Sequence, residues 1–268
     1  MIDNIAQIRN ELSSNGILRA AINMSNFLLV TDKKNDGTPI GVSPDMAQEL
    51  ANKLDLKLKL IPYNTPGEIA DDANNNKWDI CNIGAEPQRA EKITFSLAYA
   101  EIQATYLIQS NSNIKSINEV DVKGNTIAVA DKTAYGLWLE RNIKNAELIT
   151  IEGVEASMKI FIDKKSDVLA GLRPQLIETV KEIEGSKLLP GYFTSIQQGI
   201  GTSKTNIHAP YFIHNFVEEM KSNGFVKKLI LKHLVTQNFP SKSCLNQLQE
   251  MLQQIICLLY TSDAADEG

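Results

Sequence analysis

Residues 78–106 read WDICNIGAEPQRAEKITFSLAYAEIQATY, and this stretch holds the most informative pattern of the chain. Residues 80–84 are mostly apolar and end in Gly84, which predicts a short buried strand. A polar turn follows and ends at a single arginine, Arg89, before a second apolar run begins at Ile93. This order places a guanidinium beside freed backbone N–H groups, and the planar fork of arginine donors matches a carboxylate. The alternative for Arg89 is an ion pair with Glu86 or Glu91 on a solvated surface.

The wider pattern resembles a known family. From Asp79 to Tyr99, the spacing D-I-x-x-x-x-x-x-P-x-R-x-x-x-I-x-F-S-x-x-Y is similar to the signature of the two-lobed solute-binding proteins of polar amino-acid ABC transporters. Other landmarks follow in the same order over residues 5–235. The resemblance implies an α/β chain with the type II periplasmic-binding-protein fold: two α/β lobes joined by two crossover strands. It also implies that Arg89 binds the carboxylate of a small ligand.

The same resemblance sets the expected organisation of the chain. Lobe 1 is expected to be discontinuous, with residues 1–107 plus 203–256, and lobe 2 to comprise residues 108–202. Residues 257–268 are expected to be a non-native tail, because residues 257–267 (CLLYTSDAADE) resemble a translated sequencing adaptor. The implied protein is a monomeric receptor that closes over its ligand by a hinge motion and presents it to an ABC transporter permease.

Composition excludes several other classes. The chain has 268 residues, 43% hydrophobic and 22% charged, with a net charge of −5, and no basic cluster suits a phosphate backbone, so nucleic acid is excluded as a partner. No segment reaches the ~20 apolar residues of a membrane span. Walker, G-x-G-x-x-G and G-x-S-x-G motifs are absent, and the spacing of His208, His214 and His233 does not indicate a metal site. We therefore expect no cofactor and no metal.

The compartment stays open at this point. The family resemblance implies a periplasmic protein, yet the first residues, Met1-Ile2-Asp3, show no basic and apolar signal peptide. Either a leader was removed or the protein acts in the cytoplasm. The cysteines, Cys81, Cys244 and Cys257, form no evident disulfide framework, and Cys81 fits a small core residue in a buried strand.

Candidate ligand-binding residues in lobe 1 follow the predicted strands. Residues 17–23 form a short apolar run typical of a central parallel strand, and ligands of open α/β sheets bind at the carboxyl edge. Asn26 and Phe27, which follow this strand, are therefore pocket candidates, although a loop amide and a core phenylalanine explain them equally well. Asn82 and Gly84 are expected to flank Arg89 through polar and backbone contacts. A helix over residues 46–54 is predicted, with Ser43 as its N-cap.

In lobe 2, a buried strand over residues 127–130 precedes a loop of small residues and a helix that ends near Asn142. A strand, a loop and a helix N-terminus together can bind an anion through backbone donors and the helix dipole. The family uses this loop to contact the same carboxylate, which implies a role for Lys132, Thr133 and Ala134. Tyr135 is a candidate for stacking on the ligand, whereas Trp138 has the helical spacing of a core residue.

Two positions depart from the family pattern. The family has threonine three residues before the arginine, where this chain has Glu86, and its ammonium-binding aspartate aligns with Leu172, which Arg173 follows. One interpretation is an amino-acid-like ligand whose cation meets Glu86; another is a ligand without an α-amino group, with two acidic ends bound by Arg89 and Arg173. In the structural alternative, Glu86 caps a turn and Arg173 is a surface residue.

Two further function classes are alternatives to the receptor. A few members of this fold family resemble cyclohexadienyl (arogenate/prephenate) dehydratases, which need a general acid, and Glu86 is the strong candidate near Arg89. A cytoplasmic ligand-sensing domain has less support, because no helix-turn-helix or kinase segment is present to receive its signal. The sequence therefore favours a solute receptor without catalytic residues.

Overall fold

The computed structural model describes residues 5–13 and 15–235, and these residues divide into two compact units. Unit 1 contains the residues up to Ala100 and from Gln197 onward, and unit 2 is the continuous stretch Glu101–Ile196. Both boundaries fall earlier along the chain than the expected ones after residues 107 and 202. The reason is that β7 (Ala100–Gln109) pairs with strands of unit 2, whereas β12 (Thr194–Ser203) pairs from Gln198 onward with strands of unit 1. Residues 257–268 lie outside the described part of the chain.

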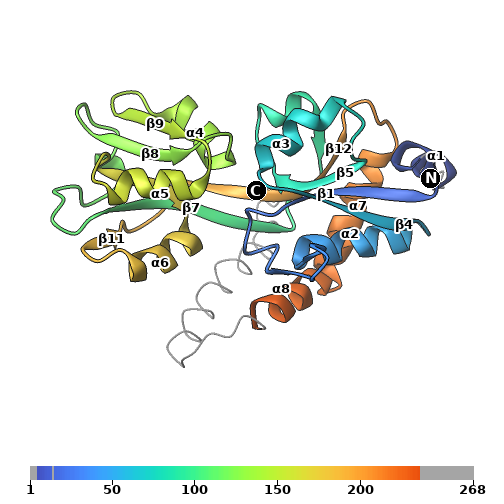
Figure 1. Cartoon of the computed structure of the whole chain (residues 1–268). Coiled ribbons are helices and arrows are strands. Elements are labelled where there is room, and N and C mark those ends of the chain that lie inside the picture. Colours follow the sequence, from blue (N-terminus) through green and yellow to red (C-terminus); the bar gives the residue numbers. More distant parts are fainter. Residues whose placement is uncertain (1–4, 14, 236–268) are drawn as a thin grey trace, which may run out of the picture. The chain divides into compact units, whose positions relative to one another are not determined.

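Unit 1 is built on the strand order β4-β1-β5-β12, in which β4, β1 and β5 are parallel and β12 is antiparallel. Its other elements are a hairpin, a short strand on β12 and helices (Figure 1). The elements of this unit besides β12 are α1 (Ile5–Leu12), β1 (Ile17–Asn23), β2 (Asp32–Lys33), β3 (Pro39–Ile40), α2 (Val42–Lys53), β4 (Lys57–Tyr63), α3 (Pro66–Asp71), η1 (Asp72–Asn74), β5 (Ile80–Gly84), η2 (Arg89–Glu91), β6 (Ile93–Phe95), α7 (Ala209–Ser222) and α8 (Phe225–Val235).

Alternation of side chains along β1 and β5 places helices on both faces of this sheet. Ala21 and Cys81 face α3, where they form one apolar cluster with Ile69 and Trp78, and the Trp78 indole N–H donates to the Ile69 carbonyl (3.1 Å). The helix α2 lies on the other side of the sheet in Figure 1. Burial raises the pKa of the Cys81 thiol to about 12, so it is an inert core group, as predicted. Cys244 and Cys257 lie outside the described residues.

The start of α2 differs from the prediction. Its N-cap is Gly41, not Ser43, and no side chain caps the helix. Gly41 has φ 155°, and a Cβ there would stand 2.3 Å from the Leu29 carbonyl oxygen, so the chain enters the helix through a close approach that requires glycine. The Ser43 hydroxyl is instead 3.0 Å from the Tyr99 hydroxyl in the interior of the unit.

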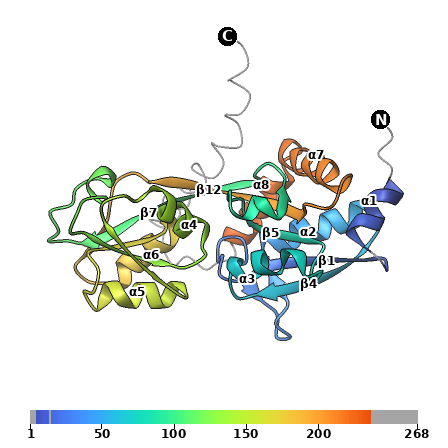
Figure 2. The same cartoon turned by 90° about the horizontal axis from the view of Figure 1, so that it is seen from above.

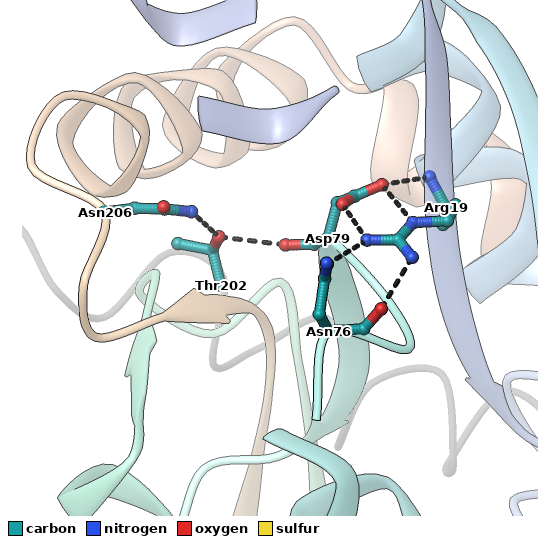
Figure 3. Close-up of polar contacts among 5 residues, drawn as sticks. All are labelled: Arg19, Asn76, Asp79, Thr202 and Asn206. Atoms are coloured by element: carbon teal, nitrogen blue, oxygen red, sulfur yellow. Dashed lines mark hydrogen bonds and ion pairs between the residues drawn. The ribbon is translucent and has the colours of Figure 1, made fainter. Parts of the chain in front are cut away.

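A polar network joins β1, β5 and β12 at the edge where β1 and β5 begin (Figure 3). The Asp79 carboxylate accepts hydrogen bonds from Arg19 at its backbone N (2.7 Å), Nε (3.0 Å) and Nη2 (2.7 Å). Arg19 also donates to the Asn76 carbonyl (2.7 Å) and side chain (2.6 Å). The Asp79 carbonyl accepts from Thr202 (2.9 Å), whose hydroxyl accepts from Asn206 (2.7 Å). One aspartate thereby fixes the register of three strands.

Unit 2 has the strand order β7-β10-β8-β9, with β11 on β7. The strands β8, β9 and β10 are parallel, and β7 is antiparallel to β10. The helix α4 packs on one face with Ile127 and Val129, while α5 and α6 pack on the other with Ala128 and Leu169 (Figure 2). Besides β7, the elements are η3 (Ile117–Glu119), β8 (Thr126–Ala130), α4 (Ala134–Asn142), β9 (Glu147–Ile151), α5 (Val154–Ile162), β10 (Val168–Leu172), α6 (Arg173–Glu182) and β11 (Ser186–Leu188).

The Asp121 carboxylate binds the backbone of the turn between α4 and β9, and this contact predicts that stability depends on pH. Its carboxylate accepts from the backbone N–H groups of Lys144 (3.0 Å), Asn145 (2.7 Å) and Ala146 (2.9 Å). Burial alone would raise the pKa of Asp121, but these donors together lower it below its ordinary value of 3.8. Because the folded pKa is depressed, the stabilisation is present above pH 3.8 and is lost as pH falls through the folded value.

We therefore expect Asp121→Asn to lower the free energy of unfolding at neutral pH, with a difference from wild type that shrinks below pH 3.8. Urea denaturation across this pH range measures the difference. Asp163→Asn is the control, because the Asp163 carboxylate is exposed and forms a 3.3 Å ion pair with Lys165 on the surface. An Asp121→Asn difference that is independent of pH would contradict the prediction.

Candidate functional site

The strongest candidate residue, Arg89, begins η2 just beyond the carboxyl end of β5 in unit 1. Its side chain is 4% exposed, and its Nη1 donates to the Gly84 carbonyl (2.7 Å). Burial lowers the pKa of the guanidinium to about 10, although the negative charge of Glu86 opposes this shift. At neutral pH Arg89 is therefore a buried cation with a fixed orientation, and the interpretation as a solvated surface residue is wrong.

Glu86 has a structural task in the turn before η2. Its Oε2 accepts the backbone N–H of Gln88 (2.9 Å) and of Arg89 (3.4 Å), and the side chain is 5% exposed. One oxygen of the Glu86 carboxylate, Oε2, therefore caps the turn, as the structural alternative predicted. The negative charge of Glu86 also stands next to Arg89, so Glu86 remains within the candidate site. Its contact with a ligand cation stays a prediction.

The other unit 1 candidates lie at the same sheet edge. Because β1 and β5 are parallel, with Ile22 opposite Asn82, residues that follow β1 are near the carboxyl end of β5. Asn26 is buried and donates through Nδ2 to the Gln198 side chain (3.4 Å), whereas Phe27 is half-buried. Asn82 is buried within β5, two residues before Gly84.

In unit 2, Thr133 forms the N-cap of α4. Its hydroxyl accepts the Gly136 N–H (3.0 Å) and donates to the Ala130 carbonyl (2.8 Å). A Cβ at Gly136 would stand 2.7 Å from that carbonyl oxygen, so glycine permits the helix to start directly after β8. With its hydroxyl occupied by the cap, Thr133 can offer a ligand its backbone N–H, which belongs to the group of donors that a helix N-terminus leaves without intrahelical acceptors.

The neighbours of Thr133 have different surroundings. Lys132 is exposed and has a left-handed φ of 51°, and Ala134 is buried. Tyr135 is 4% exposed within the apolar cluster of unit 2, and burial raises its pKa to about 12. Trp138 is partly buried and lies against Phe193, with ring centroids 5.3 Å apart. The role of Tyr135 in ligand stacking stays a prediction.

Arg173 begins α6, directly after β10. Its Nη1 donates to the Gly191 carbonyl (2.8 Å), which also accepts from the Thr105 hydroxyl (2.9 Å). The parallel pairing of β10 with β8 puts Arg173 and the loop before α4 at the same edge of the unit 2 sheet. Arg173 is half-buried at the first position of α6, and its contact with a ligand stays a prediction.

Sequence reasoning missed three buried polar residues of unit 1: Ser43, Tyr99 and Gln198. Tyr99 had a signal, because it closes the motif that contains Arg89, but its partner Ser43 was assigned to a helix cap. Gln198 lies in β12, and its residue type alone carries no sign that the side chain is buried. Within residues 5–13 and 15–235, no group of three or more His, Cys, Asp or Glu side chains is placed to hold a metal ion. No helix in that part of the chain has the length and apolarity of a membrane span.

Two units, each a sheet with helices on both faces and candidate residues at the carboxyl ends of parallel strands, define the fold of type II periplasmic binding proteins. The chain belongs to the bacterial extracellular solute-binding proteins, family 3, which it matches over residues 18–236. The predicted fold class and family are thus confirmed, and the protein is a solute-binding protein.

Relatives agree with this assignment at low identity. The fold is similar to that of a mutant ArgBP from T. maritima, with 19% identity, a TM-score of 0.69, and coverage of 85% of this chain and 99% of that chain. It is equally similar to a cysteine-binding protein from Campylobacter jejuni, with 19% identity, a TM-score of 0.69, and coverage of 87% and 93%. Cyclohexadienyl dehydratase from Pseudomonas aeruginosa is 23% identical over 164 residues, and the match spans 60% of each chain.

Proposed function

We propose that this protein binds a small amino acid or a related organic acid through the ligand carboxylate, with Arg89 as the anchor. The observation that carries the proposal is a buried guanidinium held in one orientation at the carboxyl edge of the unit 1 sheet. A planar guanidinium can bind a carboxylate through two parallel hydrogen bonds, and low exposure strengthens such a pair. Asn82, Gly84, Asn26 and Phe27 are proposed as neighbouring contacts.

The names of the relatives support the ligand class. They include an ArgBP, a cysteine-binding protein and an amino acid ABC transporter substrate-binding protein, AbpA from Streptococcus pneumoniae, bound to L-arginine. By analogy we propose an ABC transporter permease as the partner of this chain. The family description refers to extracellular proteins, and we propose a periplasmic or extracellular location on that basis.

For unit 2 we propose that the backbone N–H groups of residues Lys132–Tyr135 form a second anion-binding element. Arg173, at the adjacent strand end, adds positive charge at this edge. Two ligand types then remain candidates: an α-amino acid whose ammonium group meets Glu86, and a diacid whose second carboxylate meets Arg173. Double-mutant cycles between Arg89 and Arg173 measure whether both act on one ligand.

A dehydratase is the second candidate, supported by the match to cyclohexadienyl dehydratase over 60% of that enzyme. The candidate general acid, Glu86, accepts two backbone N–H groups through Oε2, whereas a general acid must present a proton to its substrate. This geometry supports binding over catalysis. Conversion of prephenate by the purified protein, followed by absorbance, would favour the enzyme instead.

The test of the proposal is a thermal-shift screen of the purified protein against amino acids, dicarboxylates and prephenate. A ligand that binds only the folded protein adds about 2.7 kcal/mol of stability at a hundredfold excess over its dissociation constant. We expect at least one carboxylate to raise the melting temperature, and the matching ligand without a carboxylate to have no effect. A screen in which no carboxylate shifts the melting temperature would overturn the proposed ligand class.

A further inference from the structure

Unit 1 contains a cluster of uncharged polar side chains that neither the capping of helices nor the pairing of strands explains. All of its members are less than 9% exposed, and we refer to it as the amide cluster: Asn26, Ser43, Asn82, Tyr99 and Gln198. The Tyr99 hydroxyl is 3.0 Å from the Ser43 hydroxyl and 3.5 Å from Asn82 Oδ1. Asn26 Nδ2 donates to Gln198 Oε1 (3.4 Å).

Strand register places the amide cluster on one face of the sheet. In the antiparallel pair of β12 and β5, Gln198 lies opposite Gly84, and Ile200 lies opposite Asn82. Gln198 and Asn82 are therefore diagonal neighbours on the same face, a relation that brings long side chains within reach of each other. Because Asn26 is bonded to Gln198, it joins the same face from the loop after β1. The Gly84 carbonyl, opposite Gln198 in the register, accepts from Arg89, so Arg89 is bound to the strand that carries Asn82.

Two atoms of the amide cluster are buried without a hydrogen-bond partner: Asn82 Nδ2, a donor, and Asn26 Oδ1, an acceptor. Both side chains are more than nine-tenths buried, at 3% and 6% exposed. A buried polar atom that makes no hydrogen bond costs about 1–3 kcal/mol, so native proteins rarely keep one without a reason. Asn26 is bonded to Gln198, and Asn82 is the diagonal neighbour of Gln198 in the sheet, so this donor and this acceptor point to a group that supplies the matching acceptor and donor.

A single group that matches both atoms has to offer an acceptor and a donor together. No member of the amide cluster carries a charge, and burial raises the pKa of the Tyr99 hydroxyl far above neutrality, which keeps it protonated. A carboxylate would place an oxygen against Asn26 Oδ1, and an ammonium would place a donor against Asn82 Nδ2. A primary carboxamide carries a carbonyl acceptor and two N–H donors side by side in one plane, so it can satisfy both atoms.

We propose that the amide cluster is the specificity site of this protein and binds a primary carboxamide on the ligand, with Asn82 donating to its oxygen and Asn26 accepting from its nitrogen. This inference rests on the proposed function, in which Arg89 binds the carboxylate of the same ligand. The ligand class is then a carboxylate that carries a neutral carboxamide. Asn82 and Asn26 act as specificity-determining residues, while Arg89 supplies affinity for every carboxylate.

The experiment compares matched ligand pairs by isothermal titration calorimetry with the full chain: L-glutamine against L-glutamate, and L-asparagine against L-aspartate. Each pair differs by one carboxamide in place of a carboxylate. We expect the amide of the better pair to bind at least about tenfold more tightly than its acid, which corresponds to one lost buried hydrogen bond. Asn82→Asp is expected to remove this preference by placing an acceptor against the ligand oxygen.

Asn23→Asp is the matched control. Asn23 is a buried asparagine at the end of β1, and its Oδ1 already accepts from the Ser25 N–H (3.2 Å) and hydroxyl (2.8 Å), so aspartate preserves these bonds. Its amide-to-acid ratio is expected to equal that of wild type. Urea denaturation shows whether each variant is folded, and the wild-type ligand pairs keep the test decisive if Asn82→Asp does not fold.

Equal binding of amide and acid by wild type overturns the inference, and so does an unchanged preference in folded Asn82→Asp. The first result assigns the two atoms to a buried water, which also supplies a donor and an acceptor. These failures are distinct from failure of the proposed function, in which no carboxylate binds or Arg89 variants bind as wild type does. In that case the inference falls together with the function on which it rests.

Discussion

Replacement of Arg89 by lysine is expected to weaken binding of the carboxylate ligand by about 100-fold, as measured by isothermal titration calorimetry. Removal of a buried hydrogen-bonded charge partner costs about 2–5 kcal/mol, and every 1.4 kcal/mol is tenfold in affinity. Lysine retains the positive charge but not the planar fork, and its ammonium group cannot donate to the Gly84 carbonyl and to both carboxylate oxygens in the same geometry. The loss therefore measures orientation and not charge alone.

Arg141→Lys is the control for the Arg89 variant, because Arg141 is an exposed arginine in the last turn of α4, away from the strand ends of unit 2. Binding by Arg141→Lys is expected to equal that of wild type. The melting temperature without ligand separates lost binding from lost folding, since Arg89 is itself 4% exposed. A folded Arg89→Lys protein with wild-type affinity would show that the anchor lies elsewhere.

The second large effect is expected on stability, at Asp79. Asp79→Ala should lower the free energy of unfolding by about 2–3 kcal/mol, below the 3–5 kcal/mol of a fully buried broken pair, because the Arg19 side chain is 29% exposed. The substitution removes the acceptor of three Arg19 donors and leaves the cation in a partly buried place. Arg19→Met should cost less, since Asp79 would retain the backbone N–H of residue 19. Urea denaturation measures both variants.

Lys53→Met provides the comparison for an exposed pair. Lys53 contacts Glu219 between α2 and α7, with side chains that are 35% and 49% exposed. Loss of an exposed ion pair changes stability by about 0–1 kcal/mol. If Asp79→Ala proved no more costly than Lys53→Met, the network in Figure 3 would be a surface arrangement without a structural role.

Much of the fold could be predicted from the sequence, because hydrophobic periodicity and the length of apolar segments indicate which segments form strands and helices. The strand over residues 17–23 and the helix that ends at Asn142 were expected where they occur. The strand β9 (Glu147–Ile151) was missed although Leu148, Ile149 and Ile151 are apolar, because a short apolar run without full burial resembles a loop or a helix end as much as an edge strand. The start of α3 has a local signal in the sequence, because Thr65 and Glu68 form a capping box and Pro66 occupies the first helical position.

The candidate site was less predictable than the fold. Arg89 could be predicted as a candidate because the motif places it after a buried strand and because a guanidinium matches a carboxylate. The amide cluster could not be predicted in this way, because it depends on the register of β12 against β5. It also depends on the contact between the Tyr99 and Ser43 hydroxyl groups, which sequence reasoning had replaced by a helix cap at Ser43. Long-range pairing of this kind leaves no periodic trace in one sequence.

Unit 2 is continuous in the chain, whereas unit 1 contains both segments around it. During synthesis the ribosome therefore delivers every strand of unit 2 before unit 1 receives β12, α7 and α8. Domains generally fold as units in the order in which they emerge, but here the unit that starts the chain is completed last. Until β12 arrives, one edge of β5 has no antiparallel neighbour, and an unpaired strand edge is a site for association with other chains. The strand that precedes Arg89 is therefore the part of the unit 1 sheet whose edge stays unpaired until β12 is made.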